Sequence, residues 1–84
     1  AGGFTNLNWI SLRNTKVTDN GLKPLTKLQF LQYINLSGTQ VTDKSISTLA
    51  SMKSLNEIYL WNSQVTESGA KKLRESLPDA KIIF

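Results

Sequence analysis

Three acidic side chains recur at equal intervals in this 84-residue chain: Asp19, Asp43 and Glu67. Each follows a threonine and precedes an apolar helical pattern, which is typical of a helix start whose carboxylate interacts favourably with the positive end of the helix dipole. The chemical alternative is a ladder of carboxylates that binds cations. We interpret the three residues as helix-start caps and expect no metal site.

The residues that catalysis most needs are absent or scattered. The sequence has no His and no Cys, which removes the commonest general base and the thiolate nucleophile. A hydrolase would need a nucleophile beside a base, or two facing carboxylates. Glu57, Glu75 and Asp79 lie in different predicted segments, and no Gly-rich phosphate loop is present. We therefore expect no catalytic residues and no cofactor.

An internal repeat of 24 residues defines the elements that position these side chains. It aligns three segments, LNWISLRNTKVTDNGLKPL, LQYINLSGTQVTDKSISTL and LNEIYLWNSQVTESGAKKL. The alternating apolar residues of each first half predict a short strand, and the Leu spacing of each second half predicts a helix. Such a unit cannot bury its apolar side alone, so stacked units with paired parallel strands are expected.

A column of small hydroxyl side chains ends each predicted strand, at Thr15, Thr39 and Ser63. Backbone groups turn inward where the chain leaves the strand, and a hydroxyl can serve them without bulk. We expect a buried hydroxyl ladder there. In the first predicted helix, Pro24 falls one turn in, which leaves either a short 3₁₀ turn or a late helix start.

The pattern LxxIxLxxTxV followed by V-T-D-x-G-L resembles the leucine-rich repeat family, of the ribonuclease-inhibitor-like kind. It is most similar to bacterial repeats of the T-x-V-T-D-x-G-L type, and the resemblance covers Leu7 to Ala80. It implies an α/β right-handed solenoid, a short horseshoe with a parallel concave sheet and convex helices. It also implies a non-catalytic binding module, and it points to the cell envelope as one location.

We expect residues 1–84 to form a single domain, with repeats at about 7–30, 31–54 and 55–79. Partial repeats are expected at 1–6 and 80–84, because Pro78 ends the last helix and Lys81-Ile82-Ile83-Phe84 reads as a truncated strand. The segment Arg74-Glu75-Ser76-Leu77 carries one residue more than the earlier repeats. We interpret the chain as a C-terminal fragment of a longer protein.

The concave face should carry the strand residues that alternate with the buried ones. Eleven residues are expected on this face, and five of the eleven are aromatic, although aromatic residues make up only 8% of the chain. Trp9 should lie beside Tyr33, and Tyr59 beside Phe84. This stripe is either cross-strand packing that stabilises the sheet or a hot spot for a protein partner. The predicted concave residues are Trp9, Ser11, Arg13, Tyr33, Asn35, Ser37, Glu57, Tyr59, Trp61, Ile82 and Phe84.

The net charge of +4 does not by itself indicate nucleic acid, because the basic residues fall mainly on predicted turns and helices. On the concave face only Arg13 and Glu57 are expected to be charged, whereas single-stranded nucleic acid requires basic and aromatic side chains on one surface. No apolar run reaches the roughly 18–20 residues that span a bilayer. We expect neither a nucleic-acid partner nor membrane insertion.

The sequence thus predicts a binding or scaffolding module that contacts a protein partner, or an adjoining domain, through its aromatic concave face. One alternative is binding of carbohydrate or cell wall, since aromatic side chains also stack on sugars. Another is a structural role as the C-terminal cap of a longer repeat array. Exposed ends of the stack also predict self-association, because an unpaired strand edge invites pairing.

Overall fold

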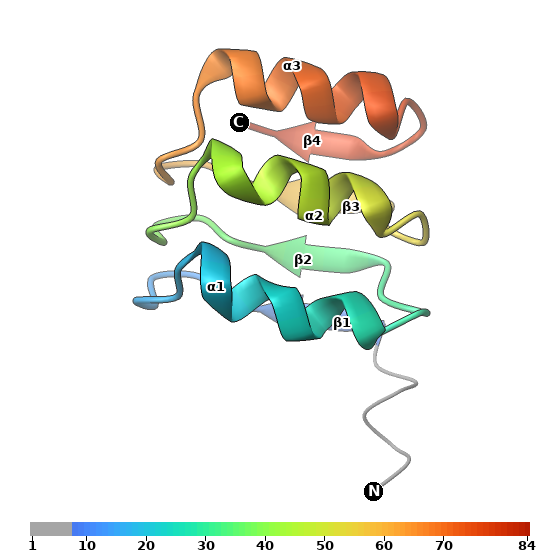
Figure 1. Ribbon diagram of the computed structural model, residues 1–84, viewed down its shortest axis with the longest axis horizontal. Coiled ribbons are helices and arrows are strands. Elements are labelled where there is room, and N and C mark those ends of the chain that lie inside the picture. Colours follow the sequence, from blue (N-terminus) through green and yellow to red (C-terminus); the bar gives the residue numbers. More distant parts are fainter. Residues whose placement is uncertain (1–7) are drawn as a thin grey trace, which may run out of the picture.

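Four short strands form one parallel sheet in the computed structural model, which describes residues 8–84. The strands follow one another across the sheet in the order β1-β2-β3-β4, so each is paired with the next one along the chain (Figure 1). Their bounds are β1 Trp9–Ser11, β2 Tyr33–Asn35, β3 Glu57–Tyr59 and β4 Lys81–Ile83.

A helical segment follows each of the first three strands, and all of these segments cover the same side of the sheet (Figure 1). The result is a mixed α/β fold of two layers, in which no helix or strand of residues 8–84 covers the other side of the sheet. The helical segments are α1 Asp19–Leu22 with η2 Lys23–Lys27, η3 Asp43–Ser45 with α2 Ile46–Ser51, and α3 Glu67–Ser76.

The register of the sheet keeps the repeat interval in every strand pair. Ile10 is paired with Ile34, Ile34 with Ile58, and Ile58 with Ile82. Because side chains alternate along a strand, this column points toward the helices, and its central members Ile34 and Ile58 are fully buried. The core therefore lies between the sheet and the helical layer.

Pro24 shortens the first helical segment. Helix α1 ends at Leu22, and a 3₁₀ helix continues from Lys23 to Lys27 with Pro24 in its first positions. Proline lacks the N–H that an α-helix would need farther in, and a 3₁₀ start tolerates that loss. Of the two outcomes that the sequence leaves open, a short 3₁₀ turn or a late helix start, the structure therefore shows the 3₁₀ turn.

The prediction for the last strand was wrong by one residue. Ile82 was expected on the open face, but it is 8% exposed and lies opposite Ile58. The turn before β4 compensates for the residue added in α3. The Ala80 N–H donates to the Leu77 carbonyl, as the Leu55 N–H donates to the Met52 carbonyl. The turn and the strand are closer together in the last repeat: β3 begins at Glu57, two residues after Leu55, whereas β4 begins at Lys81, directly after Ala80. This loss of one residue offsets the residue added in α3.

Each of the first three strands ends in a turn that places one residue in the left-handed region. These residues are Asn14, Gly38 and Asn62, with φ of 60°, 70° and 58°. Asparagine and glycine are the residues that adopt this conformation most readily. At Gly38 a side chain would also collide with the side-chain oxygen of Asn14, so glycine is required there by contact as well as by φ.

The hydroxyl column donates to the carbonyls at the strand ends. Thr39 Oγ1 donates to the Leu36 carbonyl at 2.6 Å, Ser63 Oγ to the Leu60 carbonyl at 2.7 Å, and Thr15 Oγ1 to the Leu12 carbonyl at 2.6 Å. Burial differs along the column: Thr39 is buried, Ser63 half-buried and Thr15 exposed. The expected burial of Thr15 was wrong, because no unit among residues 8–84 packs on the outer side of the first one.

Replacing Thr39 by Val should lower the free energy of unfolding by about 1–3 kcal/mol, because the buried Leu36 carbonyl loses its hydroxyl donor while the shape is kept. Thr15→Val removes the same hydrogen bond at an exposed position, where water replaces the donor, and should cost less. Urea denaturation of both variants measures the difference. Equal costs for the two substitutions would contradict this role of burial.

Candidate functional site on the open face of the sheet

The open face carries two rows of side chains that run across the strands. The first row is Trp9, Tyr33, Glu57 and Lys81, and the second is Ser11, Asn35, Tyr59 and Ile83. Trp9 and Tyr33, expected to be neighbours, are register partners whose rings lie 5.2 Å apart with an angle of 11° between their planes. The ring of Tyr59 lies 5.3 Å from that of Tyr33, tilted by 44°. We call Trp9, Tyr33 and Tyr59 the aromatic strip.

The rings of the aromatic strip face one another rather than the solvent. Neighbouring strands lie about 4.8 Å apart and their side chains stand away from the sheet, so near-parallel rings at 5.2 Å pack face to face across the strands. This packing uses the sides of the Trp9 and Tyr33 rings that face each other. Trp9, at the edge strand, remains 54% exposed.

Polar neighbours fix the two tyrosines. Asn35 Nδ2 donates to Tyr33 Oη at 3.4 Å, and Tyr59 Oη donates to Glu57 Oε2 at 3.2 Å. Desolvation, and then the adjacent Glu57 carboxylate, raise the pKa of Tyr59, so its phenol stays protonated and keeps donating. These hydrogen bonds restrict the two tyrosine side chains before any partner binds, which reduces the entropy that binding would cost.

Most of the predicted concave residues do lie on or beside this face, with different exposures. Five are exposed: Trp9, Ser11, Arg13, Trp61 and Phe84. Four are half-buried: Tyr33, Asn35, Glu57 and Tyr59. Trp61 lies in the turn after β3 and is 62% exposed, the largest exposure among the big hydrophobic side chains of residues 8–84.

Three placements differ from the prediction. Ser37 is buried; its N–H donates to Asn35 Oδ1 and its carbonyl accepts from the Asn14 N–H. Ile82 points into the core, opposite Ile58. Phe84 is 45% exposed but does not pair with Tyr59, whose register partner is Ile83.

Other exposed residues were missed by sequence reasoning. The shifted last strand brings Lys81 onto the open face, so Arg13 and Glu57 are not its only charged residues. Phe30 is 58% exposed in the turn before β2, outside the strands. Its only signal in the sequence was a large apolar residue at a turn position where the next repeat has Ser54.

The acids at the helix starts have a role that differs from simple capping. Asp19 does begin α1, but its carboxylate accepts from the next unit, from the Thr42 N–H at 2.8 Å, Thr42 Oγ1 at 2.6 Å and Ser45 Oγ. Asp43 repeats this with the N–H of Thr66 at 2.7 Å and with its hydroxyl. Each carboxylate thus ties one unit to the next.

The threonines do the capping that was assigned to the acids. Thr42 Oγ1 accepts from the Lys44 N–H at 3.2 Å, and Thr66 Oγ1 from the Gly69 N–H at 3.3 Å. Glu67 begins α3 in the position of Asp19 and Asp43, but the segment after α3 contains a strand and no further helix start to tie. Within residues 8–84 no group of three potential metal ligands comes together.

The hydrogen bonds also set the protonation of both aspartates. Burial acts to raise the pKa of Asp19, but the hydrogen bonds from Ser45 and Thr42, with Lys44 nearby, outweigh it and hold the pKa below its usual value. The Thr66 hydroxyl and N–H lower the pKa of Asp43, with a smaller contribution from Lys72. Both carboxylates are therefore charged near neutral pH.

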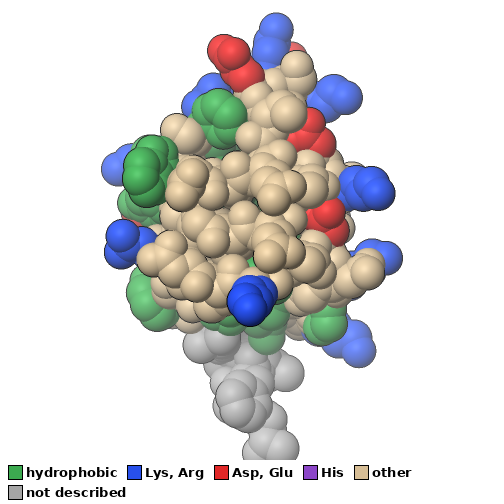
Figure 2. Space-filling view, turned by 90° about the vertical axis from the view of Figure 1, so that its left-hand side faces the viewer, with side chains coloured by type: hydrophobic (Ala, Val, Ile, Leu, Met, Phe, Trp, Pro, Cys, Tyr) green, Lys and Arg blue, Asp and Glu red, His purple; other side chains and the backbone are tan. Residues whose placement is uncertain are grey.

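Charged side chains gather away from the aromatic strip. Figure 2 views the end where the strands run into their turns: a row of charged side chains lies along the margin on the helix side, and hydrophobic side chains lie mainly along the opposite margin, with some Lys or Arg side chains among them. The exposed basic residues of the helical side and the turns are Lys16, Lys23, Lys27, Lys44, Lys53, Lys71, Lys72 and Arg74. No helix within the described residues is long and apolar enough to cross a membrane.

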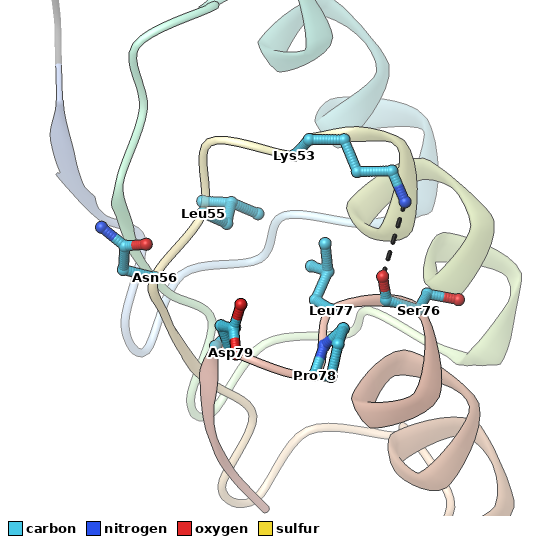
Figure 3. A pocket seen from close by; sticks show the side chains of 8 residues that line it. Lys53, Leu55, Asn56, Ser76, Leu77, Pro78 and Asp79 are labelled. Carbon is cyan, nitrogen blue, oxygen red and sulfur yellow. Dashed lines mark hydrogen bonds between the residues drawn. The ribbon is translucent and has the colours of Figure 1, made fainter.

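A hollow of about 280 Å³ lies at the other end of the strands, beside the turn between α3 and β4 (Figure 3). Lys53 Nζ donates to the Ser76 carbonyl across it at 3.5 Å. A cation at the last carbonyls of a helix stabilises the helix end. Asp79 is the one acid in the lining, and the hydrogen bond from Lys53 goes to the backbone carbonyl of Ser76 and not to its hydroxyl.

Comparison with known proteins establishes the fold alone. No family model matches the chain, and no protein of curated function matches it. The chain is similar to a solved structure described as "Structure of Chaetomium Mex67:Mtr2 subunits", with a TM-score of 0.76, 22% identity and 92% of this chain covered. The match spans 53% of that chain, so this chain corresponds to about half of it.

The ties predict how stability depends on pH. Because both aspartates have lowered pKa values in the folded state, the stability they contribute is present above the unfolded-state pKa of about 3.9 and is lost as the pH falls through the folded pKa. Asp19→Asn with Asp43→Asn should lower the urea midpoint at pH 7 and flatten its fall between about pH 5 and pH 3.

The exposed acid Glu75, replaced by Gln, is the control for the loss of a negative charge on the helical side. It should leave the slope of the urea midpoint against pH nearly unchanged. If the doubly substituted chain lost stability on acidification as steeply as the parent, the carboxylate ties would not be a source of its stability.

Proposed function

We propose that the chain is a leucine-rich-repeat module of the ribonuclease-inhibitor-like kind, stacked as a right-handed solenoid with the open face of the sheet on its concave side. The support is the match between the repeat in the sequence and the sheet, in which successive strands pair in parallel at one interval. Helical segments on a single side of the sheet add to it.

We further propose that the module is non-catalytic and binds a protein partner or an adjoining domain through the open face. The observation that carries this is the aromatic strip on a face that no helix of residues 8–84 covers. Trp9, within the strip, and Trp61, in the turn after β3, are each more than half exposed. Trp and Tyr are enriched among the residues that dominate binding energies in protein interfaces, since they bury a large area with few rotatable bonds.

The protein-binding proposal gains some support from the similar structure, whose description names two subunits together. That description is of the other protein, and here it serves only as an example of this fold within an assembly. The exposed lysines of the helical side do not share a surface with the aromatic strip, so we propose a solvated face there and no nucleic-acid partner.

Carbohydrate or cell-wall binding is the weaker alternative. A sugar stacks on an open ring face, but Trp9 and Tyr33 cover one face of each other. The two most exposed tryptophan rings are that of Trp9, on β1, and that of Trp61, in the turn after β3. A peptide or protein surface can contact ring edges as well as ring faces, so the row of rings in the aromatic strip suits a protein partner better than a sugar.

A role as the C-terminal cap of a longer repeat array has one observation in its favour. Arg74 Nη2 donates to the Ile82 carbonyl of the edge strand β4 at 3.5 Å. A side chain that occupies a strand-edge carbonyl hinders the pairing of a further strand. This role is compatible with binding through the open face, because it concerns a different surface.

Trp9→Ala combined with Trp61→Ala should weaken binding to a partner by at least about tenfold, since truncation of a hot-spot residue typically costs about 2 kcal/mol or more. The measurement is quantitative capture from native lysate by the immobilised chain, followed by titration of any captured protein. Phe30→Ala is the matched control, because Phe30 is similarly exposed but lies outside the strands.

Circular dichroism and the urea midpoint verify that the variants are folded. The proposal requires proteins that the parent and Phe30→Ala capture and the double variant does not. Capture that the double variant retains in full would refute it, and a glycan array bound by the parent but not by the double variant would favour carbohydrate.

A further inference from the structure

The two ends of the stack differ in how well their apolar columns are covered. Ile10 and Leu12 in the first unit are only half-buried, whereas their counterparts Ile34 and Leu36 are 0% exposed. Val17, Leu25 and Leu28 show the same incomplete burial, although they pack against the core. Strand β1 is also an edge of the sheet, so the first unit presents an apolar layer beside a free strand edge among residues 8–84.

A pair of hydrogen-bond donors lies on the same outer surface. Thr18 corresponds to Thr42, whose N–H and hydroxyl donate to the carboxylate of Asp19 in the preceding unit. The backbone of Thr18, at φ −117° and ψ −179°, has nearly the angles of Thr42, at −117° and −175°. The Thr18 N–H precedes α1 and belongs to the surface between units, and within residues 8–84 no carboxylate meets it.

The opposite end of the stack is better covered, although β4 is also an edge strand. The apolar columns there are buried, including Leu77 at 6% and Ile82 at 8% exposure. The Ile82 carbonyl at the outer strand accepts from Arg74. Within the described part of the chain, only one end of the stack therefore combines a free strand edge, incompletely covered apolar columns and available donors.

We propose that the outer surface of the first unit is a docking surface for one further strand–turn–helix unit whose helix begins with a carboxylate. The occupant is inferred from the interface that the chain already forms twice, in which Asp19 meets Thr42 and Asp43 meets Thr66. The added strand pairs with β1, its apolar residues cover the half-buried columns, and its carboxylate accepts from Thr18. The proposal uses a different surface from the open face and does not depend on its function.

The test extends the chain by one unit of its own sequence. A copy of residues 31–54 is joined directly before Leu7, in place of residues 1–6, so that the copied Asp43 stands in the same register to Thr18 as Asp43 does to Thr66. Hydrogen exchange of the Thr18 amide is then compared between the extended chain and the 84-residue chain. We expect exchange to slow by at least about tenfold on extension, as a buried charge-assisted hydrogen bond implies.

Two variants of the extended chain separate the tie from general stabilisation. Asn at the copied Asp43, and Thr18→Val, should each lower its urea midpoint, whereas Glu75→Gln should not. In the 84-residue chain Thr18→Val should leave the midpoint nearly unchanged, because the Thr18 side chain makes no capping hydrogen bond there. Thr18→Val therefore remains informative if the Asn variant of the extended chain fails to fold.

Unchanged exchange of the Thr18 amide on extension would overturn the proposal. So would a Thr18 amide that exchanges as slowly as that of Thr42 in the dilute 84-residue chain. If the Thr18 amide of the 84-residue chain exchanged slowly only at high protein concentration, the surface would bind a second copy of the chain. That result would also overturn the proposal, because the occupant would not be a further strand–turn–helix unit. None of these outcomes affects the Trp9 and Trp61 capture experiment, so the two proposals fail separately.

Discussion

The carboxylate of one unit holding the threonine of the next is the polar interaction that recurs between the helical units of the stack. Asp19 and Asp43 satisfy both the N–H and the hydroxyl of a threonine 23 residues onward, and the threonine in turn caps its own helix. The tie fixes where each helical segment begins relative to the one before it. Because the strand before each tie is only three residues long, such a fixed point matters for keeping the units in register.

The open face is a consequence of that register. Equal spacing of the units puts chemically similar positions side by side, so Trp9 meets Tyr33 and Tyr33 approaches Tyr59. The same spacing aligns the isoleucine column on the other side of the sheet, between the strands and the helical layer. One constraint thus builds the core and displays the aromatic strip, while the charged side chains lie mainly on the helical side and in the turns.

Periodicity in the sequence predicted the regular features of the fold, but contacts between units could not be predicted from it. The repeat interval gives the parallel strands, the column of isoleucines and the pairing of Trp9 with Tyr33, since one interval determines both neighbours. The repeat interval cannot show that the Asp19 carboxylate turns away from its own helix. Capping of a helix and a hydrogen bond to the next unit have the same sequence pattern, a Thr-Asp pair in each repeat. Alternation also did not predict the burial of Ser37, since Trp61 at the same place in the next repeat is exposed.

The last strand shows a different limit. Counting residues in the sequence revealed that α3 carries one residue more than the earlier repeats. That the turn before β4 is one residue shorter becomes visible only in the structure, where Ala80 packs against the core. A sheet tolerates no shift by one residue, since every side chain would change faces. The structure therefore restores the register in the preceding turn, and Ile82 enters the core while Lys81 and Ile83 face outward.

A double-mutant cycle on Asp19 and Thr42 tests the central tie most directly. The free energy of unfolding is measured for Asp19→Ala, Thr42→Ala, the double variant and the parent chain. A coupling energy of roughly 1–2 kcal/mol at pH 7 is predicted, because a charge-assisted hydrogen bond joins the two side chains. A coupling energy near zero, with additive costs, would contradict the claim that these carboxylates hold the units together.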